Sequence, residues 1–174
     1  MSKYTGHERE LKVKVKAIIV TVSTSRFEAF KSGLKVNDES GDYVEFCLRK
    51  INADIVKRII VPDDISEIRN VINKHMGNAN LVVFIGGTGL TKTDITYEAI
   101  KPILDKELTT FPSLFTYLSY GDVGTAVLAS RVLAGVKDKM LIFCLPGSTG
   151  AVKLAMEKII IPELGHLFNM IHSE

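Results

Sequence analysis

The sequence predicts an α/β fold: a three-layer α/β/α sandwich with a mostly parallel sheet. Two observations predict it. Short apolar runs rich in β-branched residues recur along the 174 residues, and segments with helical spacing lie between them. Such alternation is typical of parallel sheets that helices cover on both faces. A chain of this length ordinarily makes one domain, and no repeat or low-complexity tract divides it.

Four segments are expected to form the buried strands of this sheet. Each is short and apolar, and turn residues flank it. Continuous apolar runs are typical of strands covered on both faces, because both sets of alternating side chains then point into the protein. The four segments are residues 13–23, 55–61, 81–85 and 140–145.

Apolar residues recur at helical spacing between those segments. Val44, Leu48 and Ile51 lie at i, i+4 and i+7 and so predict a helix. Similar spacing predicts helices over residues 65–72, 123–134 and 151–161. The stretch 104–122 is less regular, although one helix face could hold Phe111, Leu114, Phe115 and Leu118.

Charge and composition exclude several classes of protein. The 22 basic and 20 acidic residues nearly balance, at a net charge of +2, so nucleic acid is not expected as a partner. No apolar run reaches the length of about 18 residues that a membrane span needs, and the polar N-terminus lacks the apolar core of a signal peptide. We therefore expect a cytoplasmic protein without a membrane partner. Residues 1–12 are expected to form a flexible arm and residues 13–174 the domain.

Glycines, hydroxyls or carboxylates follow each of the four predicted strands. In open α/β sheets, ligands bind outside the carboxyl ends of the strands, where the following loops meet. The segments in question are residues 21–26, 62–64, 86–89 and 146–150. Their common polarity predicts a ligand site at this edge of the sheet.

The loop at Gly86, Gly87 and Gly89 is the most informative of the four. Three glycines in four positions allow positive φ angles and a close approach of backbone to ligand. Thr93 or Asp94 would then cap a helix over residues 96–100, and a glycine loop before a helix is a common phosphate site. An ordinary tight turn between strand and helix remains the alternative.

Asp94 also has two interpretations. It could serve only as a helix N-cap, or it could hold Mg²⁺ beside a bound phosphate, because a bare carboxylate would repel that phosphate. Asp63, which follows another strand, could supply a second carboxylate. The simpler interpretation of Asp63 and Asp64 is a solvated cap for a helix that starts near Ile65.

Two known nucleotide-binding motifs nearly fit the glycine loop. A P-loop would need glycine where Thr91 stands, and the dinucleotide fingerprint would need it where Lys92 stands. A nucleotide-binding α/β protein of another kind is therefore a weak third possibility, besides the two that follow.

Six short blocks occur in an order that resembles one family. The most specific is Gly-Gly-Thr-Gly at 86–89, followed by Asp94, Thr96, Glu98 and Ala99. The others lie at residues 21–23, 38–41, 62–64, 130–135 and 145–148. Together they resemble the MoaB/Mog family of molybdenum cofactor biosynthesis proteins, and MoaB most closely, over about residues 13–165. The resemblance makes residues 13–174 a molybdopterin-binding domain.

The resemblance implies an activity. In such proteins the terminal phosphate of molybdopterin attacks the α-phosphate of ATP with Mg²⁺ bound, and pyrophosphate leaves. The adenylated molybdopterin then passes to a downstream metal-insertase protein. A homotrimer, or a hexamer made from two trimers, is the implied assembly. The alternative is a carrier or scaffold of the same pathway that binds molybdopterin without turnover.

The resemblance also assigns roles to residues. Asp63 and Asp94 would be catalytic and hold Mg²⁺. The backbone of Gly86–Gly89 would bind phosphate, with a hydroxyl from Thr88. The pterin side would be lined by Ser119, Ser130, Arg131 and Ser148. The other expected binding residues are Ser23, Lys92, Glu98, Pro146 and Gly147.

Three positions depart from the family's pattern. Thr93 stands where arginine is frequent, Thr24 where the first block commonly has aspartate, and Tyr97 where proline often occurs. Lys92 could replace the charge that is missing at Thr93, although not arginine's two-pronged hydrogen bonding. These departures keep the carrier alternative open.

Overall fold

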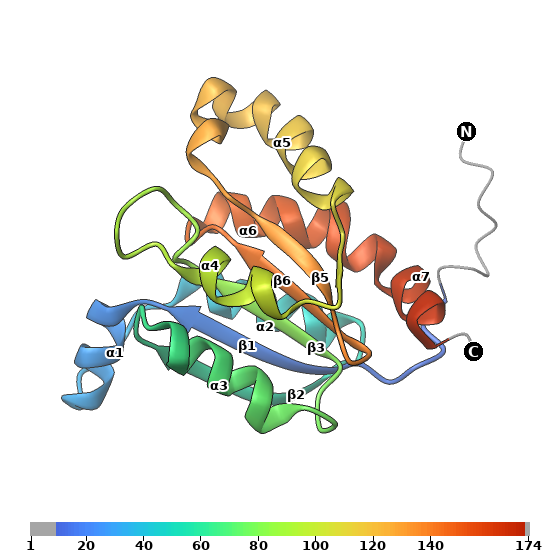
Figure 1. The fold of residues 1–174 in the computed structure, drawn as a ribbon, viewed down its shortest axis with the longest axis horizontal. Coiled ribbons are helices and arrows are strands. Elements are labelled where there is room, and N and C mark those ends of the chain that lie inside the picture. The colour runs from blue at the N-terminus through green and yellow to red at the C-terminus, as the bar shows by residue number, and fades with distance from the viewer. Residues whose placement is uncertain (1–9, 173–174) are drawn as a thin grey trace.

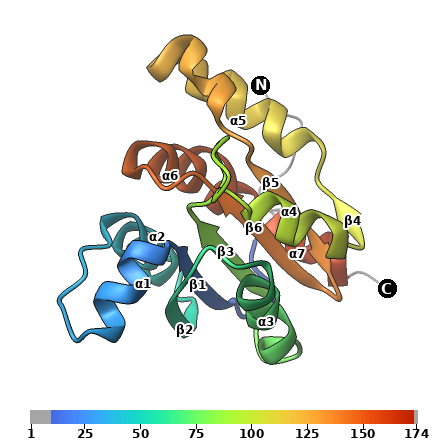
Figure 2. The same ribbon diagram turned by 60° about the vertical axis from the view of Figure 1, so that its left-hand side comes forward.

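The computed structural model describes residues 10–172, which form a six-stranded sheet covered by helices on both faces (Figures 1 and 2). The strand order is β2-β1-β3-β6-β5-β4. The first four of these strands run parallel, whereas β5 and β4 are antiparallel to their neighbours. The α/β sandwich with a mostly parallel sheet is confirmed. The strands are β1 (Lys16–Val22), β2 (Asp54–Val61), β3 (Leu81–Ile85), β4 (Lys106–Glu107), β5 (Leu133–Lys137) and β6 (Met140–Leu145).

Helices occupy most of the segments between these strands. Those predicted around Val44 and over residues 65–72 and 151–161 are confirmed, and the apolar face from Phe111 to Leu118 lies within a helix. The helices are α1 (Thr24–Lys31), α2 (Glu39–Lys50), α3 (Ile65–His75), α4 (Thr96–Ile100), α5 (Thr110–Val123), α6 (Thr149–Ala155) and α7 (Ile161–His172). A π-helix, η4 (Met156–Ile160), joins α6 to α7, and 3-10 helices η2 (Lys101–Ile103) and η3 (Gly124–Ala129) follow α4 and α5.

The helix predicted over residues 123–134 is wrong. Helix α5 ends at Val123 because Gly124 takes a φ of 58°, which leaves the helical region. After η3, the chain enters β5 and pairs antiparallel with β6. Asp138 and Lys139 both have positive φ, as a two-residue hairpin turn requires. The apolar residues from Leu133 onward therefore follow the two-residue period of a strand and not the period of a helix.

The core consists of two apolar clusters, one on each face of the sheet. Side chains of β1 alternate between them, with Ala17 and Ile19 in the first cluster and Ile18 and Val20 in the second. Helices α2, α5, α6 and α7 pack on the first cluster, and α3 and α4 on the second.

Part of the expected N-terminal arm lies outside the described residues, which begin at Glu10. Leu11 packs against the first cluster, and the Asn169 side chain donates to the Glu10 carbonyl at 3.1 Å. Among residues 10–172, no helix has the length and apolar character that crossing a membrane requires.

Candidate functional site

The loops after β1, β2, β3 and β6 meet at one edge of the sheet, as predicted. The Ser23 amide donates to the Val61 carbonyl and the Gly86 amide to the Leu145 carbonyl, each at 2.9 Å. A Cβ atom on Gly147 would lie 3.6 Å from the Gly86 Cα. The glycine loop after β3 is therefore in contact with the loop between β6 and α6.

Contacts within the protein require the glycines of the loop after β3. Gly86 and Gly87 have φ angles of 101° and 65°. A Cβ on Gly86 would lie 2.6 Å from the Val22 carbonyl oxygen, and one on Gly87 would collide with the Thr96 hydroxyl. That hydroxyl donates to the Gly86 carbonyl at 2.8 Å. The tight-turn interpretation thus accounts for the glycine pair by itself, and phosphate binding needs separate support.

Arg131 holds the glycine loop from the η3–β5 side. Its amide donates to the Thr88 carbonyl at 2.9 Å, and its Nε to the Gly89 carbonyl at 2.8 Å. Its Nη2 donates to the Asp94 carbonyl at 2.9 Å, and the guanidinium pairs with the Glu98 carboxylate. This hydrogen bonding from Arg131 holds the pKa of Glu98 below its ordinary value. Arg131 and Glu98 therefore shape the glycine loop, and neither is among the residues that line the cavity between α5, η3 and α6.

Asp94 does not cap α4, so the predicted cap at Thr93 or Asp94 is wrong. The residue before α4 is Ile95, which has no capping side chain. The Asp94 Oδ2 instead accepts from the amide and the hydroxyl of Thr91, at 2.8 and 2.5 Å. Burial raises the pKa of Asp94, but these hydrogen bonds outweigh that effect and hold the pKa below its ordinary value. The carboxylate is therefore charged at neutral pH.

Asp63 and Asp64 have different partners. Asp64 is the N-cap of α3 and accepts from the amides of Ser66 and Glu67, at 2.8 and 3.0 Å, as the capping interpretation predicts. The Asp63 Oδ2 instead accepts from the amide and hydroxyl of Thr24, at 2.8 and 2.7 Å. Asp63 lines a surface depression together with Ile95, the neighbour of Asp94.

Asp63 and Asp94 each offer carboxylate oxygens, the kind of ligand that Mg²⁺ takes when it binds together with a phosphate. Mg²⁺ takes oxygen ligands and often uses only one or two protein carboxylates, with phosphate and water oxygens completing its shell. Within residues 10–172, no group of three or more His, Cys, Asp or Glu side chains could hold a metal ion alone.

A cavity of about 320 Å³ lies between α5, η3 and the start of α6. Its walls are mainly apolar, and Ser119, Ser130 and Ser148 are among its lining residues. The Oγ atoms of Ser119 and Ser130 are buried and have no hydrogen-bond partner within residues 10–172. Ser148 precedes α6 but makes no capping hydrogen bond. The other lining residues are Phe115, Asp122, Val123, Ala126, Val127, Pro146, Gly150, Ala151 and Leu154.

The structure brings together some of the expected site residues and places others elsewhere. Ser119, Ser130, Pro146 and Ser148 share the cavity. Ser23 accepts from the Arg26 amide as the N-cap of α1. Lys92 is exposed on the loop and makes no hydrogen bond or ion pair with the described part of the chain.

Two residues of this region were missed from the sequence. Asp122 lines the cavity, and its spacing from Phe115 and Ser119, at i, i+4 and i+7, places all three on one face of α5. That spacing was available as a signal. The second residue is Ser40, which donates to the Gly147 carbonyl. Only its place in the block 38–41 indicated it in the sequence.

Comparison with known proteins identifies similar chains. A family model described as a probable molybdopterin binding domain matches residues 18–166. The molybdenum cofactor biosynthesis protein B of Bacillus cereus is 36% identical over 173 residues, which are 98% of each chain. The protein of the same name from Halalkalibacterium halodurans is 40% identical over 168 residues, 95% of each chain.

Solved structures agree with these matches. The crystal structure of the tungsten cofactor synthesizing protein MoaB from Pyrococcus furiosus superimposes with a TM-score of 0.82 at 36% identity, over 92% of this chain and 98% of that one. A crystal structure of a molybdenum cofactor biosynthesis protein B gives 0.83 at 35% identity, over 95% of this chain and all of that one.

Proposed function

Because this chain belongs to the molybdopterin-binding family of MoaB-like proteins of molybdenum cofactor biosynthesis, we propose that it binds molybdopterin and adenylylates it with Mg-ATP. The proposed chemistry joins the terminal phosphate of molybdopterin to the α-phosphate of ATP and releases pyrophosphate. The product would pass to a downstream protein that inserts the metal. Membership of this family excludes a nucleotide-binding α/β protein of another kind.

The observation that supports molybdopterin binding most directly is the pair of unpartnered hydroxyls at Ser119 and Ser130. A buried polar atom without a partner costs about 1–3 kcal/mol, and native proteins rarely keep one without a use. A pterin ring is flat and carries hydrogen-bonding groups along its edges. Such a ring would satisfy these hydroxyls while its faces contact apolar walls such as Phe115.

The carboxylates at two neighbouring loops support the nucleotide half of the proposal. Asp63 and Asp94 would hold Mg²⁺, which when bound neutralises triphosphate charge. The Gly86 amide already donates to Leu145, so the amides of Gly87 and Thr88 are the proposed phosphate contacts. The contact between Gly86 and Gly147 supports a nucleotide placed next to the cavity. Lys92 is the exposed cation proposed to reach the phosphates.

Incubation with molybdopterin and Mg-ATP, followed by mass spectrometry of the pterin, tests the proposal. We expect adenylated molybdopterin and pyrophosphate in equal amounts. Binding of molybdopterin without either product would favour the carrier alternative, which the exchanges at Thr24 and Thr93 support. Absence of molybdopterin binding would overturn both. Location in the cytoplasm, where ATP is supplied, completes the proposal.

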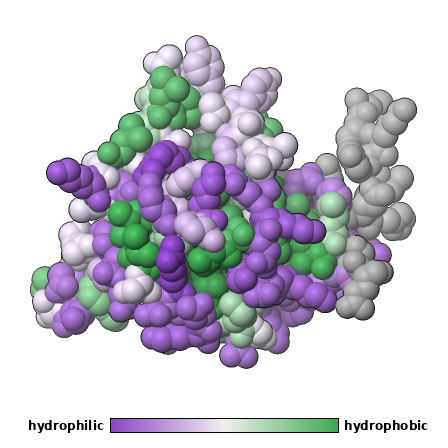
Figure 3. Space-filling model, viewed as in Figure 1, coloured by the Kyte–Doolittle hydropathy of each residue, from purple (hydrophilic) through white to green (hydrophobic). Residues whose placement is uncertain are grey.

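We propose that the protein assembles as a homotrimer or as a hexamer. Large apolar side chains are exposed along α5 and η3, and Figure 3 shows hydrophobic surface over the end of this segment. Tyr117 is 78% and Leu128 80% exposed, which is unusual unless a partner covers them. Light scattering at micromolar concentration should give three or six chain masses, and a monomer mass would contradict the assembly.

A further inference from the structure

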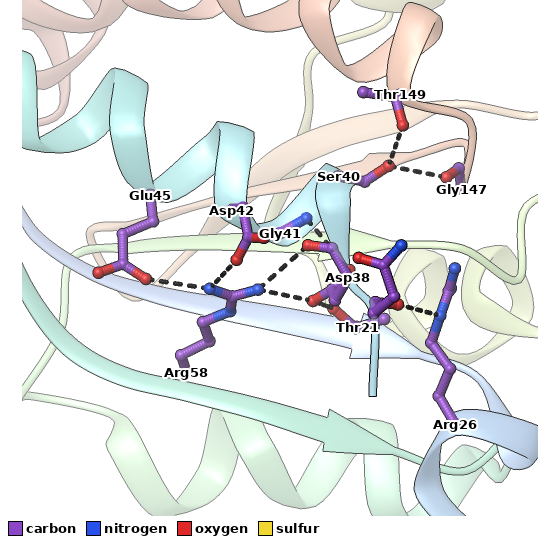
Figure 4. A network of polar contacts seen from close by, with 11 residues as sticks. Thr21, Arg26, Asp38, Ser40, Gly41, Asp42, Glu45, Arg58, Gly147 and Thr149 are labelled. Atoms are coloured by element: carbon purple, nitrogen blue, oxygen red, sulfur yellow. Dashed lines mark hydrogen bonds and ion pairs between the residues drawn. The ribbon is translucent and has the colours of Figure 1, made fainter. Parts of the chain in front are cut away.

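A network of polar contacts, in which the backbone of residues 38–40 links two groups of hydrogen bonds, extends from the edge strand β2 to the loop between β6 and α6 (Figure 4). At one end of it, the Arg58 guanidinium extends from β2 toward the start of α2. Its Nη2 donates to the carbonyl and to Oδ2 of Asp38, at 3.2 and 3.1 Å. Its Nη1 pairs with Asp42 at 2.6 Å and with Glu45 at 3.2 Å. Arg58 therefore fixes the first turns of α2 against the sheet.

Asp38 is the centre of the network and is 7% exposed. Besides Arg58, its carboxylate accepts from the Thr21 hydroxyl at 2.6 Å and, as the N-cap of α2, from the Gly41 amide at 3.1 Å. A Cβ on Gly41 would collide with this carboxylate, so glycine is required there. Burial raises the pKa of Asp38, but hydrogen bonds from Thr21, Arg58 and Gly41 outweigh it and lower the pKa. A charged Asp38 thus ties α2 to β1 and β2.

Ser40 connects the start of α2 to the candidate site. It is 6% exposed, and its Oγ donates to the Gly147 carbonyl at 2.9 Å and lies 3.3 Å from the Thr149 hydroxyl. Gly147 stands between two residues that line the cavity, Pro146 and Ser148. The same glycine contacts the loop at Gly86. The Ser40 hydroxyl therefore holds the short segment that separates the cavity from the glycine loop.

We propose that Ser40 is a positioning residue for molybdopterin: through its hydrogen bond to Gly147, it sets the position of Pro146 and Ser148 in the cavity wall. Asp38 and Arg58 support it by fixing the first turn of α2. That the ligand is molybdopterin rests on the proposed function, whereas the effect of Ser40 on the loop between β6 and α6 does not. Ser40 touches no substrate in this scheme and acts only through the loop.

Hydrogen exchange on the ligand-free protein tests the hold on the loop without reference to function. In Ser40→Ala, the amides of residues 147–151 should exchange at least about tenfold faster, which corresponds to the loss of one hydrogen bond. Ile72→Val serves as the control, because it removes a buried methylene group from the opposite face of the sheet. It should lower the melting temperature without this local change. Unchanged exchange at 147–151 in Ser40→Ala would overturn the inference.

Molybdopterin binding tests the consequence for the site. Ser40→Ala should weaken molybdopterin binding about tenfold and leave the KM for ATP within about twofold, and Ser40→Thr should restore most of the affinity because it keeps a hydroxyl. Arg58→Gln removes a residue that acts on Ser40 only through Asp38, so it should weaken molybdopterin binding less. It provides a second test in case Ser40→Ala does not fold. Equal molybdopterin affinity in wild type and Ser40→Ala would overturn the inference. Absence of binding by the wild type would instead overturn the proposed function, and hydrogen exchange would still decide on the loop.

Discussion

Thr24 donates two hydrogen bonds to Asp63, one from its amide at 2.8 Å and one from its hydroxyl at 2.7 Å, and both end on Oδ2. The Thr24 hydroxyl in turn accepts from the Asp63 amide at 3.0 Å. This reciprocal pair fastens the end of β2 to the start of α1. An aspartate at position 24, common in the family that the sequence resembles, would place a second negative charge beside Asp63. Threonine instead orients the carboxylate through a neutral group.

Thr24→Val should therefore make the Asp63 carboxylate less ordered without changing the charge of the protein. The variant keeps the hydrogen bond from the Thr24 amide but loses both hydrogen bonds of the hydroxyl, the one to the Asp63 carboxylate and the one from the Asp63 amide. We expect half-maximal adenylylation to need about three to ten times more Mg²⁺, in line with the loss of the hydrogen bond to the carboxylate. Thr24→Ser is the matched control and should behave as wild type. A magnesium titration of the rate checks this, and identical midpoints for all three proteins would contradict it.

Asp94→Asn should lower adenylyl transfer about 10²- to 10³-fold at saturating Mg²⁺, because it removes a preorganised charge from the proposed metal site. The fold should survive, since Asp94 caps no helix. Asp64→Asn is the matched control, because asparagine is an equally good N-cap and the Asp64 carboxylate accepts from Ser66 and Glu67 at the start of α3. Turnover at the wild-type rate in Asp94→Asn would remove Asp94 from the metal site.

Ser119→Ala and Ser130→Ala should separate binding from stability. Each removes a buried hydroxyl that has no partner in the described part of the chain, so the free energy of unfolding should stay the same or rise slightly. Molybdopterin affinity should nevertheless fall about tenfold for each. Thr21→Val provides the contrast, because its buried hydroxyl is paired with Asp38 and its loss should cost about 1 kcal/mol of stability. Stability loss without weaker binding would show that the two serines serve the fold.

Lys92→Ala should weaken ATP binding about tenfold or more if the lysine donates to a phosphate, because hydrogen bonds between charged groups contribute about 1.5–3 kcal/mol. Lys92→Arg should keep most of the affinity. Thr93→Arg should rescue the alanine variant by restoring a positive charge next to Asp94. Lys57→Ala, at an exposed lysine on β2, controls for the change in net charge. Equal ATP affinity for wild type and Lys92→Ala would leave the exchange at Thr93 uncompensated and favour the carrier alternative.

Stability should depend on pH through Asp38. Because its folded-state pKa lies below the ordinary value, the charged carboxylate stabilises the fold above the unfolded-state pKa of about 3.9, and this stabilisation disappears as pH falls through the folded-state pKa. The gap in unfolding free energy between wild type and Asp38→Asn should thus be widest near neutral pH and narrow below about pH 4. Denaturant titrations from pH 7 to pH 3 measure it. Asp54→Asn, at an exposed ion pair with Lys14, is the control. A gap that stays constant with pH would contradict the role of the charge.

The sequence by itself determined the parts of this protein that depend on local pattern. The four parallel strands, most helices and the cap at Asp64 follow from residue spacing and turn chemistry, which neighbouring residues decide. The meeting of four polar loops at one sheet edge also follows, because parallel strands leave their carboxyl ends together. Six short blocks were enough to indicate the family.

Tertiary structure alone decided the rest, because it depends on contacts between residues far apart in the chain. Pairing with β6 made residues 133–137 a strand, although the helix predicted from the apolar pattern extended to Ala134. The Asp94 carboxylate accepts a hydrogen bond from the Thr91 amide and does not cap α4. Arg131 donates to the glycine loop about 40 residues earlier in the chain. The unpartnered hydroxyls of Ser119 and Ser130 appear only once α5, η3 and α6 enclose them. Ser40 reaches Gly147 across 107 positions of sequence, and no local pattern encodes a contact that only the packing of α2 beside α6 creates.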